Sequence, residues 1–308
     1  MRILVTPRSM TAQGLNALTE LEPVRDLGWE LRSGPAGRLP TEDELIQLIH
    51  GVDGWIAGVE KISNRVLAAA DDLKVISRNG VGSDTIDEEA ARVRNIKICL
   101  ARGANSRGVA ELALGLVLNC LREVIPANSA LHLGTWDRTI GRELPDVTIG
   151  IIGFGAIGRT LAFLANSLGV RVVAYDPFVP IGSEVAANIV PLEQLFAVSD
   201  VISLHCPPSP DGSRIISRDN LSMMKHGAIL INTARSSLVD GVAILDALKT
   251  GALRYYAVDA FETEPPELNE LLRHPRTILT PHIGGYTTAS NRRSSELAVQ
   301  NLIAALQI

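Results

Sequence analysis

The sequence predicts an α/β protein of two doubly wound domains, each built on a parallel β-sheet with helices on both faces. Its 308 residues are enough for about two domains of ordinary size. Short apolar runs alternate with amphipathic segments from one end of the chain to the other. These runs are apolar throughout and not only at every second residue, which is typical of parallel strands covered on both faces.

The predicted strands fall into two series. The first series comprises residues 2–6, 54–57, 74–77 and 97–100, and the second comprises residues 148–152, 171–175, 201–205, 228–232, 255–259 and 277–280. Amphipathic segments at 42–50, 65–70, 109–121 and 157–168 predict helices between the strands. The last helical segment, 291–308, has no strand after it, so it could pack back onto the first domain and make that domain discontinuous.

The composition excludes several classes of protein. With 29 Lys and Arg against 34 Asp and Glu the net charge is -5, and aromatic residues make up 4% of the chain, so we expect no nucleic-acid partner. No apolar run reaches the roughly 18 residues of a membrane span, and the N-terminus is typical of a buried strand and not of a signal peptide. Three distant cysteines in apolar surroundings favour a reducing, cytoplasmic setting, without disulfides or a metal site.

A glycine loop follows the first strand of the second series. Residues 153–158 read Gly-Phe-Gly-Ala-Ile-Gly and lead into a predicted helix. Gly153 permits a tight turn, Gly155 lets the backbone approach a diphosphate, and Gly158 lets helix and strand pack closely. The start of the helix offers free N–H groups to phosphates. The alternative is a glycine turn kept for packing alone.

The strand after this helix ends in Asp176, about 20 residues beyond the loop, where an acceptor for a ribose 2′-hydroxyl belongs. Together, strand, loop, helix, strand and acid predict a dinucleotide site. Asp176 is followed by Pro177 and Phe178, not by a basic pair, which favours NAD over NADP.

Three later strands end next to ionisable residues: Arg235, Glu264 and His282. In open α/β sheets, ligands bind beyond the carboxyl ends of strands. An arginine can hold a substrate carboxylate with two parallel hydrogen bonds, and a histidine paired with a carboxylate can exchange the hydroxyl proton of a 2-hydroxy acid. The alternatives are that Arg235 is a surface ion-pair partner and that Glu264 is an exposed turn residue. The position of His282, after a proline and before two glycines, is an unusual one for a core histidine.

The full set of motifs resembles a known family. In chain order, the motifs are Arg78-Asn79-Gly80-Val81-Gly82-Ser83-Asp84, the loop 153–158, His205-Cys206-Pro207, Ile231-Asn232-Thr233-Ala234-Arg235, Asp259-Ala260-Phe261-Glu262-Thr263-Glu264-Pro265 and Thr280-Pro281-His282-Ile283-Gly284-Gly285. Their order and spacing resemble the D-isomer-specific 2-hydroxyacid dehydrogenases over nearly the whole chain.

This resemblance implies two Rossmann-like domains with NAD in the cleft between them. A discontinuous substrate-binding domain would comprise residues 1–98 plus 286–308, and the NAD-binding domain residues 99–285. The implied catalytic residues are Arg235 for the substrate carboxylate, His282 as acid/base and Glu264 as its partner. The implied cofactor residues are Gly153, Gly155, Ala156, Ile157, Gly158, Asp176, Cys206, Pro207, Thr233, Ala234, Asp259 and Gly284, with Asp259 near the carboxamide. The implied substrate residues are Lys61, Arg78, Asn79, Gly80, Val81, Gly82 and Arg235.

Within the family the motifs are most similar to those of phosphoglycerate dehydrogenases, so 3-phosphoglycerate is the expected substrate. Lys61 and Arg78 flank the proposed carboxylate loop and could reach a distal anion. However, Ala57 or Gly58 stands where several of those enzymes place an arginine for the phosphate, which keeps hydroxypyruvate or glyoxylate reduction open as an alternative.

A third alternative, of another class, is an NAD-sensing corepressor that binds a partner peptide. The helix at 109–121 and the segment around Trp136 resemble the family's dimer contacts, and we expect a homodimer.

Overall fold

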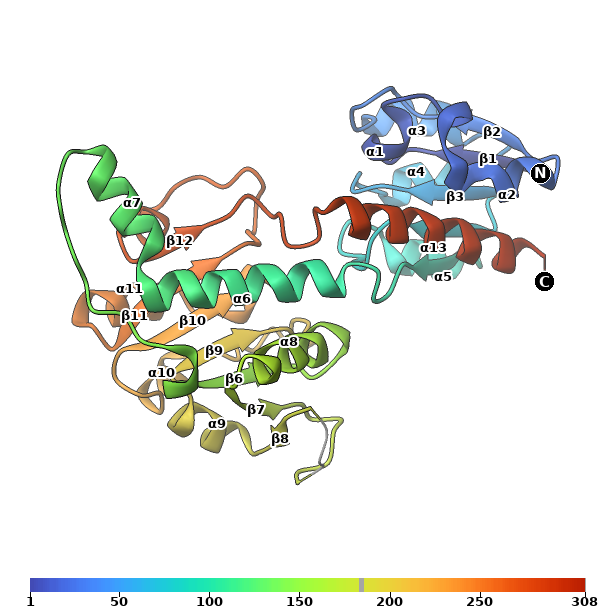
Figure 1. Ribbon diagram of the computed structural model, residues 1–308. Helices are drawn as coiled ribbons and strands as arrows, with labels where there is room; N and C mark the ends of the chain where they lie inside the picture. The colour runs from blue at the N-terminus through green and yellow to red at the C-terminus, as the bar shows by residue number, and fades with distance from the viewer. Residues whose placement is uncertain (183–185, 308) are drawn as a thin grey trace. The chain divides into compact units, whose positions relative to one another are not determined.

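The computed structural model describes residues 1–182 and 186–307, which form two compact units. The first unit comprises Met1–Asn105 with Thr287–Ile308, and the second comprises Ser106–Tyr286. Each contains one β-sheet, of five and seven strands, and every pairing of strands is parallel. The predicted fold class, α/β with two parallel sheets, is therefore confirmed (Figure 1).

The sheet of the first unit has the strand order β2-β1-β3-β4-β5. Its strands are β1 (Arg2–Val5), β2 (Glu30–Ser33), β3 (Gly54–Ala57), β4 (Val75–Arg78) and β5 (Lys97–Leu100). Its helices are α1 (Arg8–Thr11), α2 (Glu22–Asp26), α3 (Glu42–Ile49), α4 (Asn64–Ala68), α5 (Glu88–Val93) and α13 (Thr288–Leu306). Leu4 and Ile76 face one apolar core, and Ile3, Val5 and Val75 face the other, so both faces of the sheet are covered.

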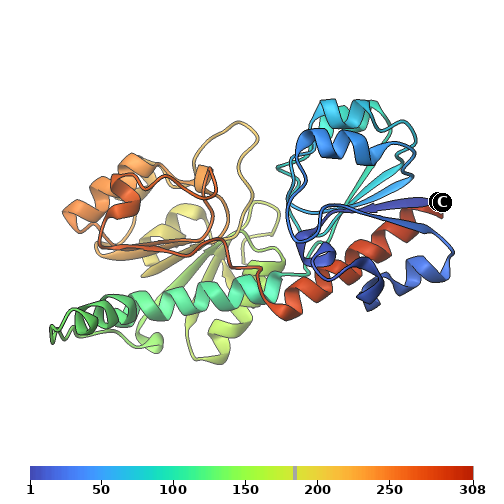
Figure 2. The same cartoon turned by 90° about the horizontal axis from the view of Figure 1, so that it is seen from above.

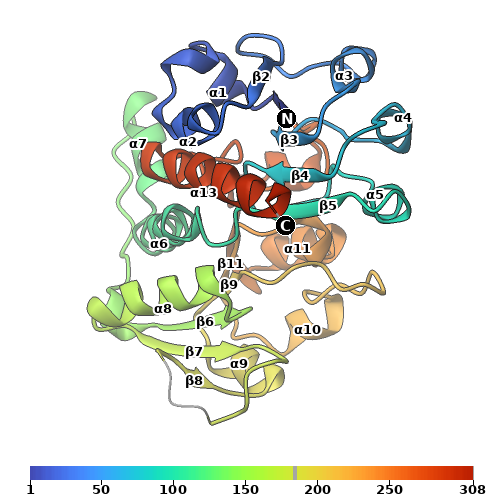
Figure 3. The same ribbon diagram turned by 90° about the vertical axis from the view of Figure 1, so that its right-hand side faces the viewer.

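Helix α13 belongs to the first unit although it lies at the end of the chain. Figure 3 shows it against the sheet, and its apolar residues Val299, Leu302 and Leu306 join the core there. A Cβ at Gly54 of β3 would lie 2.9 Å from the Leu302 side chain, so glycine is what allows this close approach. The Ser77 hydroxyl adds a hydrogen bond of 2.7 Å to a carbonyl of the helix.

The sheet of the second unit has the order β12-β11-β10-β9-β6-β7-β8. Its strands are β6 (Thr148–Ile152), β7 (Arg171–Tyr175), β8 (Asn188–Ile189), β9 (Val201–Leu204), β10 (Ala228–Asn232), β11 (Leu253–Val258) and β12 (Thr277–Leu279). The helices are α6 (Ser106–Arg122), α7 (Val124–His132), α8 (Ala156–Ser167), α9 (Leu192–Val198), α10 (Arg218–Ser222), α11 (Gly241–Thr250) and α12 (Glu270–Arg273). Helices α6 and α8 pack on one face, and α9, α10 and α11 pack on the other.

At the end of α6 the chain turns at Glu123, which has a φ of +52°, and α7 then extends outward (Figure 1, Figure 2). None of the residues of α7 is buried. We call residues 124–140 the arm. Its large apolar side chains are exposed, among them Leu133 (83%), Trp136 (79%) and Ile140 (93%). Among the described residues, no helix is long and apolar enough to cross a membrane.

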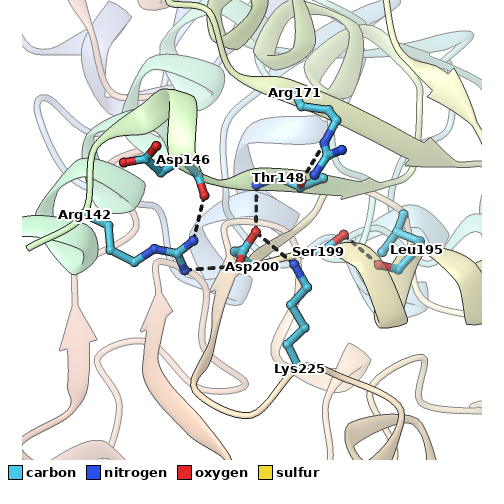
Figure 4. Close-up of polar contacts among 8 residues, drawn as sticks. All are labelled: Arg142, Asp146, Thr148, Arg171, Leu195, Ser199, Asp200 and Lys225. Atoms are coloured by element: carbon cyan, nitrogen blue, oxygen red, sulfur yellow. Dashed lines mark hydrogen bonds and ion pairs between the residues drawn. The ribbon is translucent and has the colours of Figure 1, made fainter.

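Opposite the carboxyl ends of the strands, Asp200 ties several elements of the second unit together (Figure 4). Its carboxylate accepts hydrogen bonds from the Thr148 N–H (2.9 Å), Arg142 (3.0 Å) and Lys225 (3.1 Å). Burial alone would raise the pKa of Asp200, but these donors outweigh burial and lower it. The ionised carboxylate therefore stabilises the amino edge of the sheet.

Candidate active site

The glycine loop joins the end of β6 to the start of α8. Gly153 has a φ of +93°, and a Cβ there would lie 2.6 Å from the Cys206 nitrogen, so only glycine fits. A Cβ at Gly158 would lie 2.2 Å from the Gly153 carbonyl oxygen. At Gly155, by contrast, no heavy atom of the described chain beyond the adjacent residues lies within 4 Å of a Cβ position. The backbone there faces open space that a diphosphate can enter.

The loop also offers positive charge to an anion. Ala156 and Ile157 stand in the first turn of α8, where backbone N–H groups lack partners inside the helix and the helix dipole is positive. Arg159 donates from Nε to the Phe154 carbonyl at 2.9 Å, and its guanidinium lies 5.4 Å from the centre of the Phe154 ring. Arg159 was not predicted from the sequence, although its place directly after the last glycine was an available signal.

Asp176, which follows β7, lies beside this loop. Its two carboxylate oxygens accept hydrogen bonds from the N–H groups of Phe154 (2.8 Å) and Phe178 (2.9 Å). Each oxygen keeps a second acceptor position, so the carboxylate can also receive a ribose hydroxyl. Burial raises the pKa of the Cys206 thiol to about 11, and nearby Asp176 contributes to this rise. The structure thus places Asp176, Cys206 and the glycine loop together.

His205 and Thr233 carry buried polar atoms at the carboxyl ends of β9 and β10. His205 Nε2 lies 2.8 Å from the Ser203 hydroxyl, and burial lowers the pKa of the imidazole to about 4, so the ring is neutral at neutral pH. Within the described chain, His205 Nδ1 and the Thr233 hydroxyl have no hydrogen-bond partner. Unpartnered polar atoms beside the glycine loop fit a site that binds a polar ligand. Pro207, two residues after His205, is exposed.

Arg235 is positioned by the buried side chain of Asn232, the last residue of β10. Asn232 accepts a hydrogen bond from the Ala234 N–H (3.1 Å) and donates one to the Arg235 carbonyl (2.8 Å). The Arg235 guanidinium in turn donates to the Ala234 carbonyl at 2.8 Å. These three contacts fix the backbone of the turn and the direction in which the arginine side chain leaves it.

His282 and Glu264 form a direct pair. His282 Nδ1 lies 2.7 Å from Glu264 Oε1, and both side chains are about half exposed, at 50% and 41%. Glu264 Oε1 also accepts a hydrogen bond from the Phe261 N–H at 3.2 Å, which orients the carboxylate. Because Nδ1 is held by the carboxylate, Nε2 is the ring nitrogen left for proton exchange with a substrate.

Asp259 holds the turn that carries His282. It is 1% exposed, and its carboxylate accepts hydrogen bonds from the Thr280 hydroxyl (2.6 Å) and the N–H groups of Ile283 (2.9 Å) and Gly284 (2.8 Å). His282 itself has a φ of +51°, a conformation that non-glycine residues rarely adopt. The three hydrogen bonds compensate for this strained backbone.

In the first unit, the predicted substrate loop follows β4. The Asn79 N–H donates to the Ala57 carbonyl at 2.8 Å. The remaining N–H groups of the loop, those of Gly80, Val81 and Gly82, make no hydrogen bond to another group of the described chain. Successive free N–H groups of this kind can bind an anion.

Two charged side chains lie buried beside this loop. Glu60 is 2% exposed, and Glu60 Oε1 accepts hydrogen bonds from the Thr6 hydroxyl and the Gly58 N–H (2.9 Å). Arg78 is 6% exposed and donates from Nε to the Gly82 carbonyl at 3.1 Å. In the described chain, Glu60 Oε2 and Arg78 Nη1 are both buried without a partner. Burial lowers the pKa of Arg78, and the charge of Glu60 acts against that shift, so the two side chains are close neighbours.

Lys61, by contrast, is exposed. It adds to the lowering of the pKa of Glu42, which is caused first by a hydrogen bond from Ser63. Over residues 1–182 and 186–307, no group of three or more His, Cys, Asp or Glu side chains is placed to hold a metal ion.

A glycine loop at the start of a helix, an acidic side chain beside that loop, and a histidine–carboxylate pair in the same unit are typical of one class of protein: oxidoreductases that use a nicotinamide dinucleotide. The model of one family, described as "D-isomer specific 2-hydroxyacid dehydrogenase, NAD binding domain", matches residues 114–284. The chain belongs to the D-isomer-specific 2-hydroxyacid dehydrogenase family, and its cofactor is NAD.

Two relatives of the chain carry different names. Hydroxypyruvate reductase of Thermotoga maritima is 36% identical over 87% of this chain and 89% of its own length. D-3-phosphoglycerate dehydrogenase of Methanocaldococcus jannaschii is also 36% identical over 87% of this chain, but only 52% of its own length is covered. The chain thus spans about half the length of that relative. The solved structure of the TT0316 protein from Thermus thermophilus covers 100% of this chain and 97% of its own, with a TM-score of 0.86 and 34% identity.

Proposed function

We propose that this protein interconverts hydroxypyruvate, or a similarly small unphosphorylated 2-oxo acid, and the corresponding D-2-hydroxy acid. The observation that carries the reaction is the His282–Glu264 pair at 2.7 Å, in the same unit as Arg235 and the glycine loop. When bound, the nicotinamide supplies the hydride for reduction or accepts it in oxidation. The residues of the chain bind the acid, orient it and move the proton.

In reduction, Arg235 holds the substrate carboxylate through paired charge-assisted hydrogen bonds. Protonated His282 hydrogen-bonds the substrate carbonyl oxygen through Nε2 and would give that oxygen the proton that reduction to a hydroxyl requires. Glu264 stays ionised, keeps the Nδ1 proton in place and stabilises the charged imidazolium before the transfer. Oxidation runs through the same steps in reverse.

In this proposal the first unit binds the substrate, and its charged residues favour a substrate without a phosphate group. Its strand order reverses between β1 and β3, where ligands of doubly wound sheets bind, and Glu60 lies in the loop after β3. The positive charge of Arg78 is already offset by this buried carboxylate. A hydroxymethyl group is neutral and meets no charge repulsion there, whereas a phosphate dianion would be repelled by Glu60.

The size of this repulsion follows from Coulomb's law. Two like charges about 6 Å apart, at an effective dielectric constant of about 20, repel each other by roughly 3 kcal/mol. The expected discrimination against a distal phosphate is therefore about 100-fold in kcat/KM. The sequence-based expectation of 3-phosphoglycerate rested on the likeness of the motifs and on the cations Lys61 and Arg78. The exposed Lys61 offers only one flexible cation.

The test compares hydroxypyruvate with phosphohydroxypyruvate under saturating NADH. We expect hydroxypyruvate to have the higher kcat/KM, and Glu60→Gln, which removes the charge and keeps the acceptor for Thr6, to bring the two values together. Lys61→Ala is the control on the same loop and should leave the ratio unchanged. A wild-type preference for the phosphorylated substrate, or a ratio that Lys61→Ala moves and Glu60→Gln does not, would contradict this substrate assignment.

We further propose that the chain forms a homodimer through its arm. Six large apolar side chains lie exposed there, namely Val124, Ile125, Leu131, Leu133, Trp136 and Ile140. Such a concentration is typical of a surface that another protein covers. Light scattering on the eluting protein should give twice the chain mass for the wild type. Trp136→Ser with Ile140→Ser should give the monomer mass, and a wild-type monomer would refute the proposal.

A further inference from the structure

A cavity of about 590 Å³ lies in the second unit, and its lining includes three arginines. The charged and titratable residues around it are Arg142, Arg254, Arg276, His226 and Glu123. It includes none of the residues assigned above to NAD or to catalysis. We call it the arginine cavity.

The arginine cavity lies at the amino ends of three neighbouring strands. Gly227 precedes β10, Gly251 precedes β11 and Arg276 precedes β12, and all three line the cavity. Backbone hydrogen bonds fix these residues, from the Gly227 N–H to the Ala252 carbonyl (2.9 Å) and from the Tyr256 N–H to the Arg276 carbonyl (3.0 Å). The same strands lead to Arg235, Glu264 and His282 at their carboxyl ends. At about 3.3 Å per residue, strand β10 alone separates the two edges by roughly 15 Å.

The lining has more positive than negative charge. Arg254 pairs with Glu123 at 2.8 Å, and among the described residues Glu123 is the sole carboxylate of the lining. Arg142 pairs with Asp200 at 3.0 Å, but that carboxylate is shared with Lys225 (3.1 Å) (Figure 4). In the part of the chain that the structure describes, no carboxylate lies within ion-pair distance of Arg276.

Ion pairs therefore hold the guanidinium groups of Arg142 and Arg254 in place. Arg276 is exposed, and no described carboxylate pairs with it. Held arginines lose little conformational freedom when they bind an anion, and a guanidinium matches the geometry of phosphate and carboxylate groups with paired hydrogen bonds. The cavity is also within the size range of small-molecule sites, which is about 300–1,000 Å³.

We propose that the arginine cavity is a second ligand site, which binds a small organic or inorganic anion with two or more phosphate or carboxylate groups. Arg276 and Arg142 contact the anion from two sides, and Arg254, backed by Glu123, forms part of the wall. This site lies away from the glycine loop and from His282, so the proposal does not depend on the identity of the oxidised or reduced substrate.

Isothermal titration calorimetry on the full chain tests the proposal. Inorganic pyrophosphate and citrate are the probes, one for phosphate and one for carboxylate ligands, and saturating NADH occupies the dinucleotide site in every titration. We expect saturable binding of at least one probe at millimolar concentration or below, and the tighter probe identifies the class of anion. Arg276→Gln should raise Kd about 10-fold or more, the usual effect of losing one charge-assisted contact.

Two controls make the result specific. Arg273→Gln removes an exposed arginine three residues earlier, outside the cavity, and should leave Kd unchanged. His282→Ala should also bind the probes as the wild type does, so a failure of the catalytic assignment would not affect this result. Absence of saturable binding of both probes, or equal weakening by Arg276→Gln and Arg273→Gln, would overturn the proposal.

Discussion

The hydrogen bonds of Asp259 allow a sharp test of how the active-site turn is built. Asp259→Asn preserves size and shape, but an amide has one acceptor oxygen where the carboxylate has two. In the structure one oxygen serves Thr280 and Ile283, and the other serves the Gly284 N–H. In the variant an NH₂ group faces either the Gly284 N–H or the Thr280 and Ile283 donors. At least one buried donor then loses its partner.

The magnitude follows from these contacts. An unsatisfied buried donor costs about 1–3 kcal/mol, and the left-handed backbone of His282 adds strain of about 1–3 kcal/mol that the turn can release by rearranging. If the turn relaxes, His282 leaves the position fixed by Glu264. We therefore expect kcat/KM to fall about 10- to 100-fold, and Thr280→Val, which leaves both backbone contacts intact, to lower it only about 3-fold.

The assay measures kcat/KM for hydroxypyruvate together with the Kd of NADH from fluorescence titration. The turn hypothesis predicts a loss of kcat/KM with little change in NADH affinity. The resemblance instead implies that Asp259 lies near the carboxamide of the cofactor. An Asp259→Asn variant that binds NADH much more weakly but keeps kcat at saturating NADH would refute the positioning argument and favour that cofactor contact.

Other contacts lead to three further predictions. His282→Ala should lower kcat about 100-fold or more with NADH affinity unchanged, because it removes the proton donor and leaves the glycine loop intact; near-wild-type turnover would exclude His282 as the acid. Asp176→Ser should reduce the preference for NADH over NADPH, measured as the ratio of kcat/KM values, because a carboxylate repels the 2′-phosphate; a wild type that prefers NADPH would contradict this. Asp200→Asn should destabilise the protein by about 2 kcal/mol at neutral pH in denaturant titrations. The pKa of Asp200 is lower in the folded state than in the unfolded state, so the carboxylate stabilises the protein fully above the unfolded-state pKa. This stabilisation is lost as the pH falls through the folded-state pKa. The difference in stability between the variant and the wild type should therefore vanish in strong acid. A difference independent of pH would argue against the charge.

Most of the fold could be predicted because buried parallel strands are apolar at every position. All ten predicted strands are present, and the two that were missed have physical reasons. Strand β2 (Glu30–Ser33) lies at the edge of its sheet, and none of its residues is buried, so its sequence lacks the apolar run. Strand β8 comprises only Asn188 and Ile189, too short to produce a pattern.

The active site was predictable to the extent that glycines and strand ends mark it. The sequence could not show that Asn232 fixes the Arg235 turn, or that Asp259 holds the loop around His282, because these roles depend on side-chain direction. The same limit applies to Glu60. In the sequence Glu60 is an ordinary acidic residue beside Lys61. Only the structure shows that it is buried next to Arg78, and this burial is what bears on the choice of substrate.

The arginine cavity shows a different limit of sequence reading. Motif searches concentrate on the carboxyl ends of parallel strands, since ligands of doubly wound sheets usually bind there. A parallel sheet, however, gathers residues from successive strands at both of its edges. At the amino edge of β10 to β12 the sequence has only a glycine turn or an isolated arginine before each strand, and no motif connects them. The strand order β12-β11-β10 makes them neighbours, and the chain returning from the arm adds Arg142. A cationic site can therefore form where each contributing residue, considered alone in the sequence, is an ordinary surface charge.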